Sequence, residues 1–148
     1  MADLVLAATG GRPRVPPGLD VREEELPLAV DGALRVPGYE RVHAVGDLVV
    51  VPHARFGPLV FPHWDMAIGT GEHAADAIAG VAGELDRLPY WWTEIGPRTF
   101  AEVGWPDAAV EWAEEDGTHV GRDAAGEPVA ALVDEPRRLR EARTLLGY

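Results

Sequence analysis

The stretch Val42-His43-Ala44-Val45-Gly46-Asp47 gives the clearest indication of the fold. Small and β-branched apolar residues are followed by glycine and then by a carboxylate. This order is typical of a buried parallel strand that ends at the edge of a sheet, where a polar side chain meets a ligand. A glycine before the aspartate lets a ligand approach the backbone closely. We therefore expect a strand over residues 42–47 and a functional carboxylate at Asp47.

Two further patterns precede this stretch. The continuous apolar run Leu4–Ala8 predicts a second strand that is buried on both faces, as in a parallel sheet. Leu28–Val30 and Leu34–Val36 flank Asp31-Gly32, and this spacing predicts a β-hairpin. Parallel strands together with a hairpin indicate a sheet in the first half of the chain.

A helix is expected over residues 65–81, after a loop that spans residues 53–62. Small residues recur in it at helical periodicity, so one face of the helix can approach a sheet closely. Gly69 and Gly71 each cost about 1 kcal/mol relative to alanine in a helix interior. They indicate either close packing on the sheet or the close approach of a ligand. The face expected to be buried comprises Ala67, Gly71, Ala74, Ala75, Ile78 and Ala82.

The pattern changes after a boundary at residues 83–88. Short, partly alternating segments follow, which are typical of an antiparallel sheet with one solvated face. A last helix is expected from Pro136, because proline is favoured in the first helical turn. The fold class is therefore α+β, with parallel strands and one helix in residues 1–83 and an antiparallel sheet with a final helix in residues 84–148. The strands expected in the second part cover residues 90–94, 98–103, 109–113, 119–123 and 128–133, the last two as a hairpin.

Composition and charge exclude several classes of function. The 25 acidic residues outnumber the 13 lysines and arginines, and a net charge of −12 repels nucleic acids and anionic lipids. The absence of cysteine excludes disulfides, thiolate metal sites and thiol nucleophiles. Four histidines stand at intervals of ten, which is not a ligand spacing on a helix or a strand, so no metal site is expected. No basic leader and no long apolar run is present, so we expect a cytoplasmic chain without a membrane span.

The order of motifs resembles the C-terminal part of the FAD-dependent pyridine nucleotide-disulfide oxidoreductases, in the branch of the ferredoxin, putidaredoxin and rhodocoxin reductases. The resemblance covers essentially all 148 residues. It implies that residues 1–83 are the end of an FAD-binding domain and residues 84–148 a small reductase C-terminal domain. The motifs are Asp3–Pro13, the second FAD fingerprint Val42–Asp47, the helix beginning His63-Trp64-Asp65, Pro89-Tyr90-Trp91-Trp92, and Gly104 with Pro136–Ala142.

The resemblance implies a role for each motif. Asp47, with Gly46 beside it, would bind the ribityl chain of FAD. Backbone N–H groups near Trp64 and Asp65 would face the O2 side of the isoalloxazine, and Trp91 or Trp92 would lie near the ring. Two structural alternatives remain open at this stage. Asp47 could cap a turn, and the tryptophans could pack in a domain interface, which is a common place for tryptophan.

The chain also departs from the pattern of the family. It contains no G-x-G-x-x-G motif, so neither FAD nor NAD(P)H has its usual pyrophosphate cradle here. Thr93-Glu94-Ile95 follows Trp92, where the family has Ser-Asp-Gln. Both departures concern contacts with a cofactor, so they bear on whether the chain functions alone.

Three hypotheses follow. In the first, the chain is the C-terminal portion of an FAD- and NAD(P)H-dependent reductase and does not catalyse electron transfer alone, so that NAD(P)H is used only if the missing N-terminal part is supplied. In the second, it is a truncated relative that binds a small molecule or acts without a cofactor in the former flavin pocket, with His63 and Asp65 as the acid–base candidates. In the third, it is a non-catalytic dimerisation or partner module.

Partners follow from the same reasoning. A parallel sheet that lacks its other strands leaves an open edge, which self-association or a missing N-terminal half would cover. We therefore expect a homo-oligomer or a complex with that half. The resemblance also implies a ferredoxin-type partner.

Overall fold

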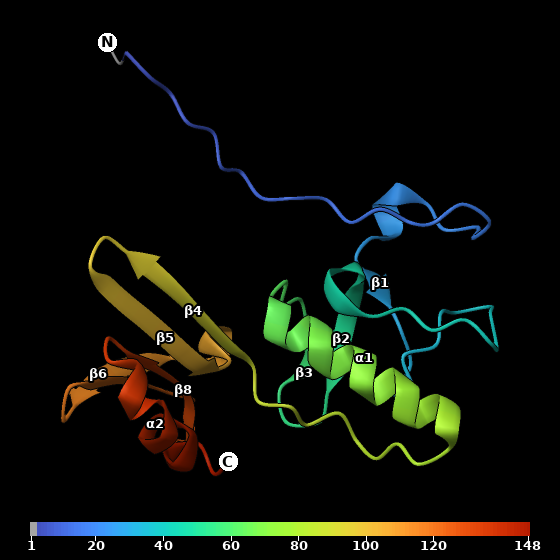
Figure 1. The fold of residues 1–148 in the computed structure, drawn as a ribbon. Coiled ribbons are helices and arrows are strands. Elements are labelled where there is room, and N and C mark those ends of the chain that lie inside the picture. Colours follow the sequence, from blue (N-terminus) through green and yellow to red (C-terminus); the bar gives the residue numbers. More distant parts are fainter. Residues whose placement is uncertain (1–2) are drawn as a thin grey trace.

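The computed structural model describes residues 3–148 and has the expected α+β fold. It contains a three-stranded mixed sheet, a five-stranded antiparallel sheet and two helices (Figure 1). Helix α1 lies beside the small sheet, α2 lies beside the large one, and the N-terminal segment extends away from both. The elements are β1 (Leu28–Ala29), β2 (Val49–His53), β3 (Gly57–Leu59), α1 (Trp64–Ala79), β4 (Tyr90–Ile95), β5 (Arg98–Gly104), β6 (Glu111–Glu115), β7 (Thr118–Arg122), β8 (Pro128–Val133) and α2 (Leu139–Leu145), with short 3₁₀ helices η1 (Glu23–Glu25), η2 (Gly46–Leu48), η3 (Pro106–Ala108) and η4 (Pro136–Arg138).

The strand expected over residues 42–47 is wrong. These residues are extended, but they make only an isolated antiparallel bridge between Arg35 and His43. The chain then turns at Gly46, which has a φ of +72°, into η2. The parallel partner of β1 is instead the next segment, β2, where Val49 and Val51 are both buried. The more apolar run after Asp47 is the strand: alternate residues of β2 are buried, whereas Ala44 is the one residue of 42–47 that is buried.

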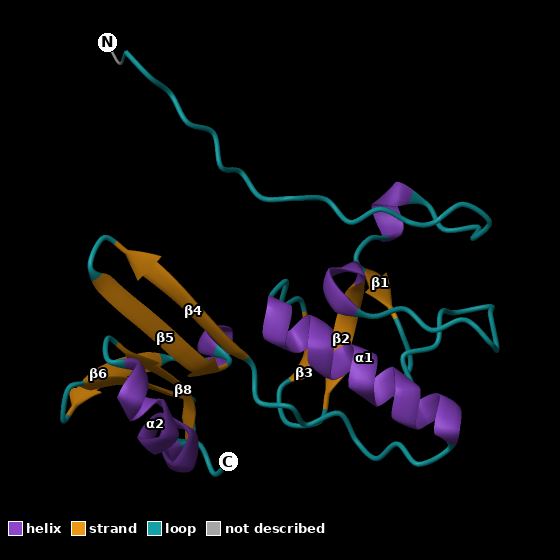
Figure 2. Ribbon diagram, viewed as in Figure 1, coloured by secondary structure: helices purple, strands orange, loops and turns teal. Residues whose placement is uncertain are grey.

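The strand expected at Leu4–Ala8 is also wrong. Residues 3–22 are irregular (Figure 2), and the side chains of Leu4 and Leu6 are more than four-fifths exposed. A parallel strand needs a neighbouring strand and a covering layer on each face. Residues 3–148 place neither beside this segment, so its apolar pattern has nothing to pack against.

The turn at Asp31-Gly32 forms, but the hairpin expected around it does not. The Leu34 N–H donates to the Asp31 carbonyl at 2.8 Å, which closes the turn. Beyond the turn, β1 pairs with β2 rather than with residues 34–36. A different hairpin, β2–β3, occupies part of the loop expected over residues 53–62, with Pro52 opposite Pro58.

Helix α1 is confirmed, but its buried face is not the one expected. Polar residues are buried on it because each has a hydrogen-bond partner. The Thr70 hydroxyl donates to the Met66 carbonyl at 3.0 Å, and His73 Nε2 lies 2.8 Å from the Gly32 carbonyl. Ile78, expected to be buried, is 71% exposed. The buried residues of α1 are Met66, Gly69, Thr70, His73 and Ala74.

The five-stranded sheet confirms the strands expected in the second half. Its order is β4-β5-β8-β7-β6, all antiparallel, and the expected β7–β8 hairpin is present. β6 begins two residues later than expected, at Glu111. Helix α2, introduced by η4 at Pro136, packs on one face of the sheet through Ala142 and through its C-cap residue, Leu146. The strands facing it contribute Ala101, Val103, Ala131 and Val133 to the same apolar cluster.

The apolar core is divided along the chain. One cluster extends from Leu28 to Leu85 and the other from Leu88 to Leu146, and Phe56 contacts both. The placement of a domain boundary after residue 83 stays a prediction. Among residues 3–148, neither helix combines the length and the apolar content that crossing a bilayer requires.

Candidate functional site

Several of the sequence-predicted site residues meet at the first turn of α1. His63 is the N-cap residue, and its Nδ1 accepts the backbone N–H of Asp65 at 3.4 Å. A neutral His63 therefore carries its proton on Nε2. Trp64 begins the helix and is 65% exposed. The first-turn N–H groups of α1 point out of this end and give it a partial positive charge.

Strand β4 brings the other aromatic residues to the same place. Trp92 lies edge-on to His63, with ring centroids 5.2 Å apart, and edge-on to Trp64 at 5.9 Å. Tyr90 stacks on Trp92 at 5.7 Å. Trp91 lies on the opposite face of β4, because side chains alternate along a strand. An apolar hollow of about 220 Å³, which we call the aromatic recess, is lined by Phe61, Pro62, His63 and Trp91.

Gly46 and Asp47 are attached to the same helix. The Gly46 N–H donates to Thr70 Oγ1 at 2.9 Å, and a Cβ on Gly46 would lie 3.5 Å from the Cβ of Ala67. Thr70 is completely buried, so this hydrogen bond holds the turn firmly against α1. Asp47 itself is exposed, and within residues 3–148 no hydrogen bond to its carboxylate is formed. Its carboxylate is therefore free to bind a ligand.

The carboxylate of Asp65 has a partner that the sequence did not predict. Arg87 donates to both of its oxygens, each at 2.9 Å, and also to Glu72 at 3.0 Å. These hydrogen bonds from Arg87 lower the pKa of Asp65 below its ordinary value. A carboxylate held as an anion in a bidentate pair is a weak base. The Asp65 side chain faces Arg87. The pairing of His63 with Asp65 as acid and base stays a prediction.

A buried carboxyl group lies beside Trp91, on the neighbouring strand of the sheet. Glu102 on β5 is opposite Trp91 on β4, and its Oε1 accepts the indole N–H at 3.1 Å. Burial raises the pKa of Glu102, and the hydrogen bond from Trp91 only partly offsets this effect. The interaction fixes the orientation of the Trp91 ring at the wall of the recess.

Replacing Glu102 by glutamine is expected to raise the free energy of unfolding by about 1 kcal/mol at pH 7. The folded-state pKa of Glu102 lies above the ordinary value of 4.5, so ionisation above that value opposes folding, and stability falls as the pH rises from it through the folded-state pKa. Glutamine keeps the acceptor for Trp91 and has no charge. Urea unfolding of both proteins at pH 4 and pH 7 measures the effect. A difference of equal size at both pH values would contradict this explanation.

Three of the other four histidines have structural partners, and the fourth, His119, is exposed. His43 Nδ1 lies 2.8 Å from the Ala33 carbonyl, and His53 Nε2 lies 3.1 Å from the Arg87 carbonyl. His73 bonds to Gly32, as described above. Within the described part of the chain, no group of three histidine, aspartate or glutamate side chains is placed to hold a metal ion.

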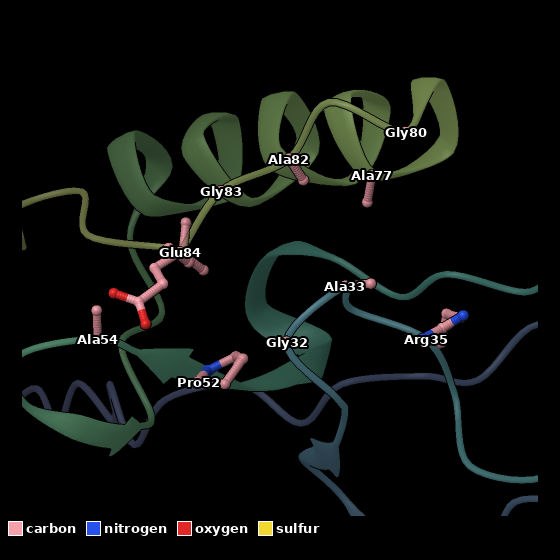
Figure 3. A pocket seen from close by; sticks show the side chains of 11 residues that line it. Gly32, Ala33, Arg35, Pro52, Ala54, Ala77, Gly80, Ala82, Gly83 and Glu84 are labelled. Carbon is pink, nitrogen blue, oxygen red and sulfur yellow. The ribbon is translucent and has the colours of Figure 1, made fainter.

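A separate cavity lies at the other end of α1 (Figure 3). Its volume is about 570 Å³, and small residues from the α1 C-terminus and from the loops around Ala33 and Gly83 line it. Its arginine, Arg35, is already paired with Asp31 at 2.8 Å. None of the sequence-predicted site residues lines this cavity, so the candidate site is the aromatic recess.

Three residues of the site were missed from the sequence: Thr70, Arg87 and Glu102. Each has a polar side chain whose role depends on a partner distant in the chain, 24, 22 and 11 residues away respectively. Only Glu102 has a sequence feature that points to it, since it is a charged residue within the apolar strand 98–103. Thr70 and Arg87 have no such feature.

Comparison with known proteins supports the fold. No protein-family model and no curated protein matches the chain. Among solved structures, it is similar to Fdr9, with a TM-score of 0.66 and 24% identity over 80% of this chain and 33% of that one. It is also similar to putidaredoxin reductase in its covalent complex with putidaredoxin, with a TM-score of 0.69 and 14% identity over 88% of this chain and 32% of that one.

A third similar structure is an FAD-dependent pyridine nucleotide-disulphide oxidoreductase from Desulfovibrio vulgaris. Its TM-score is 0.61, with 16% identity over 80% of this chain and 35% of that one. The chain thus spans about a third of the length of each of these proteins. It has the fold of part of an FAD-dependent, ferredoxin-reductase-type oxidoreductase, in agreement with the C-terminal part that its sequence motifs resemble.

Proposed function

We propose that the chain is the C-terminal portion of an FAD- and NAD(P)H-dependent oxidoreductase of the ferredoxin reductase type, and that it does not catalyse electron transfer alone. The observation that carries this proposal is the meeting of three elements at one end of α1. The Gly46-Asp47 turn is bound to α1 through Thr70, the helix begins at Trp64, and β4 places Trp91 and Trp92 beside that beginning.

These residues fit one end of FAD and not the other. A flat, apolar ring fits beside tryptophans, and an electron-rich edge of that ring is favoured at the positive end of a helix. The exposed Asp47 carboxylate is a suitable acceptor for the hydroxyl groups of a ribityl chain. By contrast, no glycine-rich turn is present to cradle a pyrophosphate. The adenylate half of FAD would therefore be bound by another part of the protein.

Each residue of the site then has a defined task. Bound FAD would supply electron transfer between a nicotinamide and an acceptor. Asp47 would orient the ribityl chain, the first-turn N–H groups at Trp64 and Asp65 would stabilise negative charge on the nearby ring edge, and Trp91 or Trp92 would cover the ring and exclude water. His63, with its Nδ1 engaged, would present Nε2–H to the recess.

The partners follow from the same proposal. The exposed apolar side chains Leu4, Val5 and Leu6 and the short edge strand β1 favour association with a nucleotide-binding half or with a second copy. One of the similar structures holds a reductase together with putidaredoxin. A ferredoxin-type partner of this protein would dock mainly on other parts of it, because this chain has a net charge of −12.

Flavin titration of the purified chain tests the proposal. We expect tryptophan fluorescence to be quenched by riboflavin and by FAD with affinities within about threefold of each other, because nothing here recognises the pyrophosphate. AMP should not compete. NADH should not be oxidised in the presence of FAD, because the sequence contains no G-x-G-x-x-G motif to bind NADH.

Two variants localise the binding. Asp47→Ala should weaken riboflavin binding by about tenfold, the loss expected for a hydrogen bond to a charged group. Asp76→Asn, an exposed aspartate near the other end of α1, is the control and should bind as the unmodified chain does. No flavin affinity at all would overturn the proposal and favour the alternative of a small-molecule-binding protein that uses the same recess.

A further inference from the structure

The segment that joins the two apolar clusters, Glu84–Pro89, is held by contacts along most of its length. The Leu85 carbonyl accepts the Ala54 N–H at 2.8 Å, and the Arg87 carbonyl lies 3.1 Å from His53 Nε2. The Pro89 carbonyl accepts the Gly104 N–H at 2.8 Å. These three contacts join the segment to the end of β2, to the residue that follows it, and to the end of β5.

Arg87 makes the side-chain contacts between this segment and α1. Its guanidinium group binds the Asp65 carboxylate through two hydrogen bonds and Glu72 through a third. These two carboxylates lie two turns apart along one side of the helix, since Asp65 and Glu72 are seven residues apart. Planar, bidentate pairing fixes the direction of the arginine as well as its distance, which a point charge would not do.

Gly69 gives Arg87 the space that it needs. A Cβ at position 69 would overlap the Arg87 Cδ and would lie 2.9 Å from its Nε, so the side chain crosses α1 directly over this glycine. Gly71, two residues further on, has nothing within 4 Å of a built Cβ. Of the two glycines, Gly69 is therefore the one that close packing requires, and the group packed on it is an arginine side chain.

The contact is adjacent to the aromatic recess. Only two residues separate Arg87 from Tyr90, where β4 starts, and Asp65 follows Trp64 directly. The pair therefore connects the strand that bears Trp91 and Trp92 to the helix turn that bears His63 and Trp64. Without the Arg87–Asp65 pair, no ion pair would hold β4 to the first turn of α1 beside the edge-on contacts of Trp92 with His63 and Trp64.

We infer that Arg87 is a positioning residue of the candidate site: clamped between Asp65 and Glu72 over Gly69, it sets β4 against the start of α1 and so assembles the aromatic recess. Asp65 then acts through its side chain as an anchor of the site rather than as an acid or base. The description of the recess as a flavin site rests on the proposed function, but the clamp itself does not.

The test compares two glycine substitutions in the same helix. Gly69→Ala inserts a methyl group into the path of Arg87 without removing any charge, whereas Gly71→Ala is the matched control with open space. We expect Gly69→Ala and Arg87→Ala to lose roughly half of the near-ultraviolet circular dichroism of the tryptophans, since coupled aromatic rings lose their fixed geometry. Gly71→Ala should keep the full signal. Far-ultraviolet circular dichroism reports whether each variant is folded.

Two further variants keep the result interpretable. Arg35→Ala removes another arginine–carboxylate pair, to Asp31, beside the cavity at the other end of α1, and should leave the tryptophan signal unchanged. Arg87→Lys retains the charge without the bidentate geometry and should lose an intermediate part of the tryptophan signal. If Arg87→Ala does not fold, Arg87→Lys replaces it in the comparison. A Gly69→Ala protein with the same tryptophan spectrum as Gly71→Ala would overturn the inference.

Riboflavin titration of the same variants separates this inference from the proposed function. Affinity should fall about tenfold in Gly69→Ala and remain unchanged in Gly71→Ala, because a disassembled site must be ordered on binding. If the unmodified chain binds no flavin while the spectra change as expected, the proposed function fails and the positioning role of Arg87 stands.

Discussion

Replacing Gly104 by alanine should destabilise the protein by about 4 kcal/mol or more, which is a large share of the roughly 5–15 kcal/mol that stabilises an ordinary domain. Two effects add at this position. Gly104 has a φ of +91°, which side chains with a Cβ rarely adopt. In addition, a Cβ would overlap the Val129 carbonyl oxygen and lie 2.9 Å from the Cα of Ala130. Both are backbone atoms of the neighbouring strand β8, so they cannot move aside without breaking the pairing of β5 with β8.

Gly126→Ala is the matched control for this experiment. Gly126 also has a positive φ, +83°, but nothing lies within 4 Å of a built Cβ. It should therefore cost only the conformational strain, about 1 kcal/mol. Urea unfolding followed by far-ultraviolet circular dichroism measures both. Equal losses of stability in the two variants would show that close packing of β5 on β8 is not what requires glycine at position 104.

His53→Ala is the substitution with the second largest expected effect, a loss of about 3 kcal/mol at pH 7.5. The His53 side chain is fully buried. Its Nδ1 accepts the backbone N–H groups of Arg55 at 3.1 Å and Phe56 at 3.2 Å, so the proton of the neutral ring is on Nε2, which donates to the Arg87 carbonyl. Alanine would leave these three partly buried backbone groups without their partner and would open a cavity where the buried ring had been.

The loss should depend on pH in a defined direction. Burial lowers the pKa of His53 below its ordinary value of 6.5, with the nearby Asp86 only partly opposing this effect. The stability that His53 provides is therefore complete above pH 6.5 and declines as the pH falls below it towards the folded-state pKa, by up to about 1.4 kcal/mol per pH unit. Protonation would also remove the acceptor at Nδ1.

Urea unfolding of the unmodified chain and of His53→Ala at pH 7.5, 6.5 and 5.5 measures this effect. The difference between the two proteins should shrink as the pH falls, because only the unmodified chain loses the contribution of His53. His119→Ala, an exposed histidine on β7, should change stability by less than about 0.5 kcal/mol at each pH. A difference that is independent of pH would exclude titration of His53 as the cause.

The second half of the chain was predicted closely from the sequence because its structure is mostly local. Its strands pair with neighbours in the chain through short turns, as in β4–β5 and β7–β8, so alternation and turn residues are sufficient to place them. Helix α1 was also placed within two residues at each end. Which of its faces is buried could not be predicted, because Thr70 and His73 are buried through hydrogen bonds to Gly46 and Gly32.

In the first half, the same pattern recognition failed for a physical reason. Leu4–Ala8 and Val42–Asp47 have the composition of parallel strands, but such strands form only against neighbours that are far away in the sequence. Residues 3–148 offer a parallel partner only between β1 and β2, and the Val49–Val51 run takes it. The apolar patterns of Leu4–Ala8 and Val42–Asp47 are those of parallel strands, but in this structure neither segment has a parallel partner.

The candidate site shows the same division. The motifs that contain Asp47, Trp64, Trp91 and Trp92, and their order along the chain, were sufficient to predict a flavin-type site by resemblance, and that site stays a prediction. The sequence by itself determined the α+β class, the two helices, the antiparallel sheet and the likeness to the ferredoxin-type reductases. Only the tertiary structure decided that Asp47 lies on a 3₁₀ turn rather than at a strand end, that Asp65 is paired with Arg87, and that Glu102 holds Trp91. The fold class and its elements follow from local propensity and periodicity, and the likeness follows from the order of motifs. The surroundings of Asp47, Asp65 and Glu102 depend instead on contacts between residues that only the fold brings together.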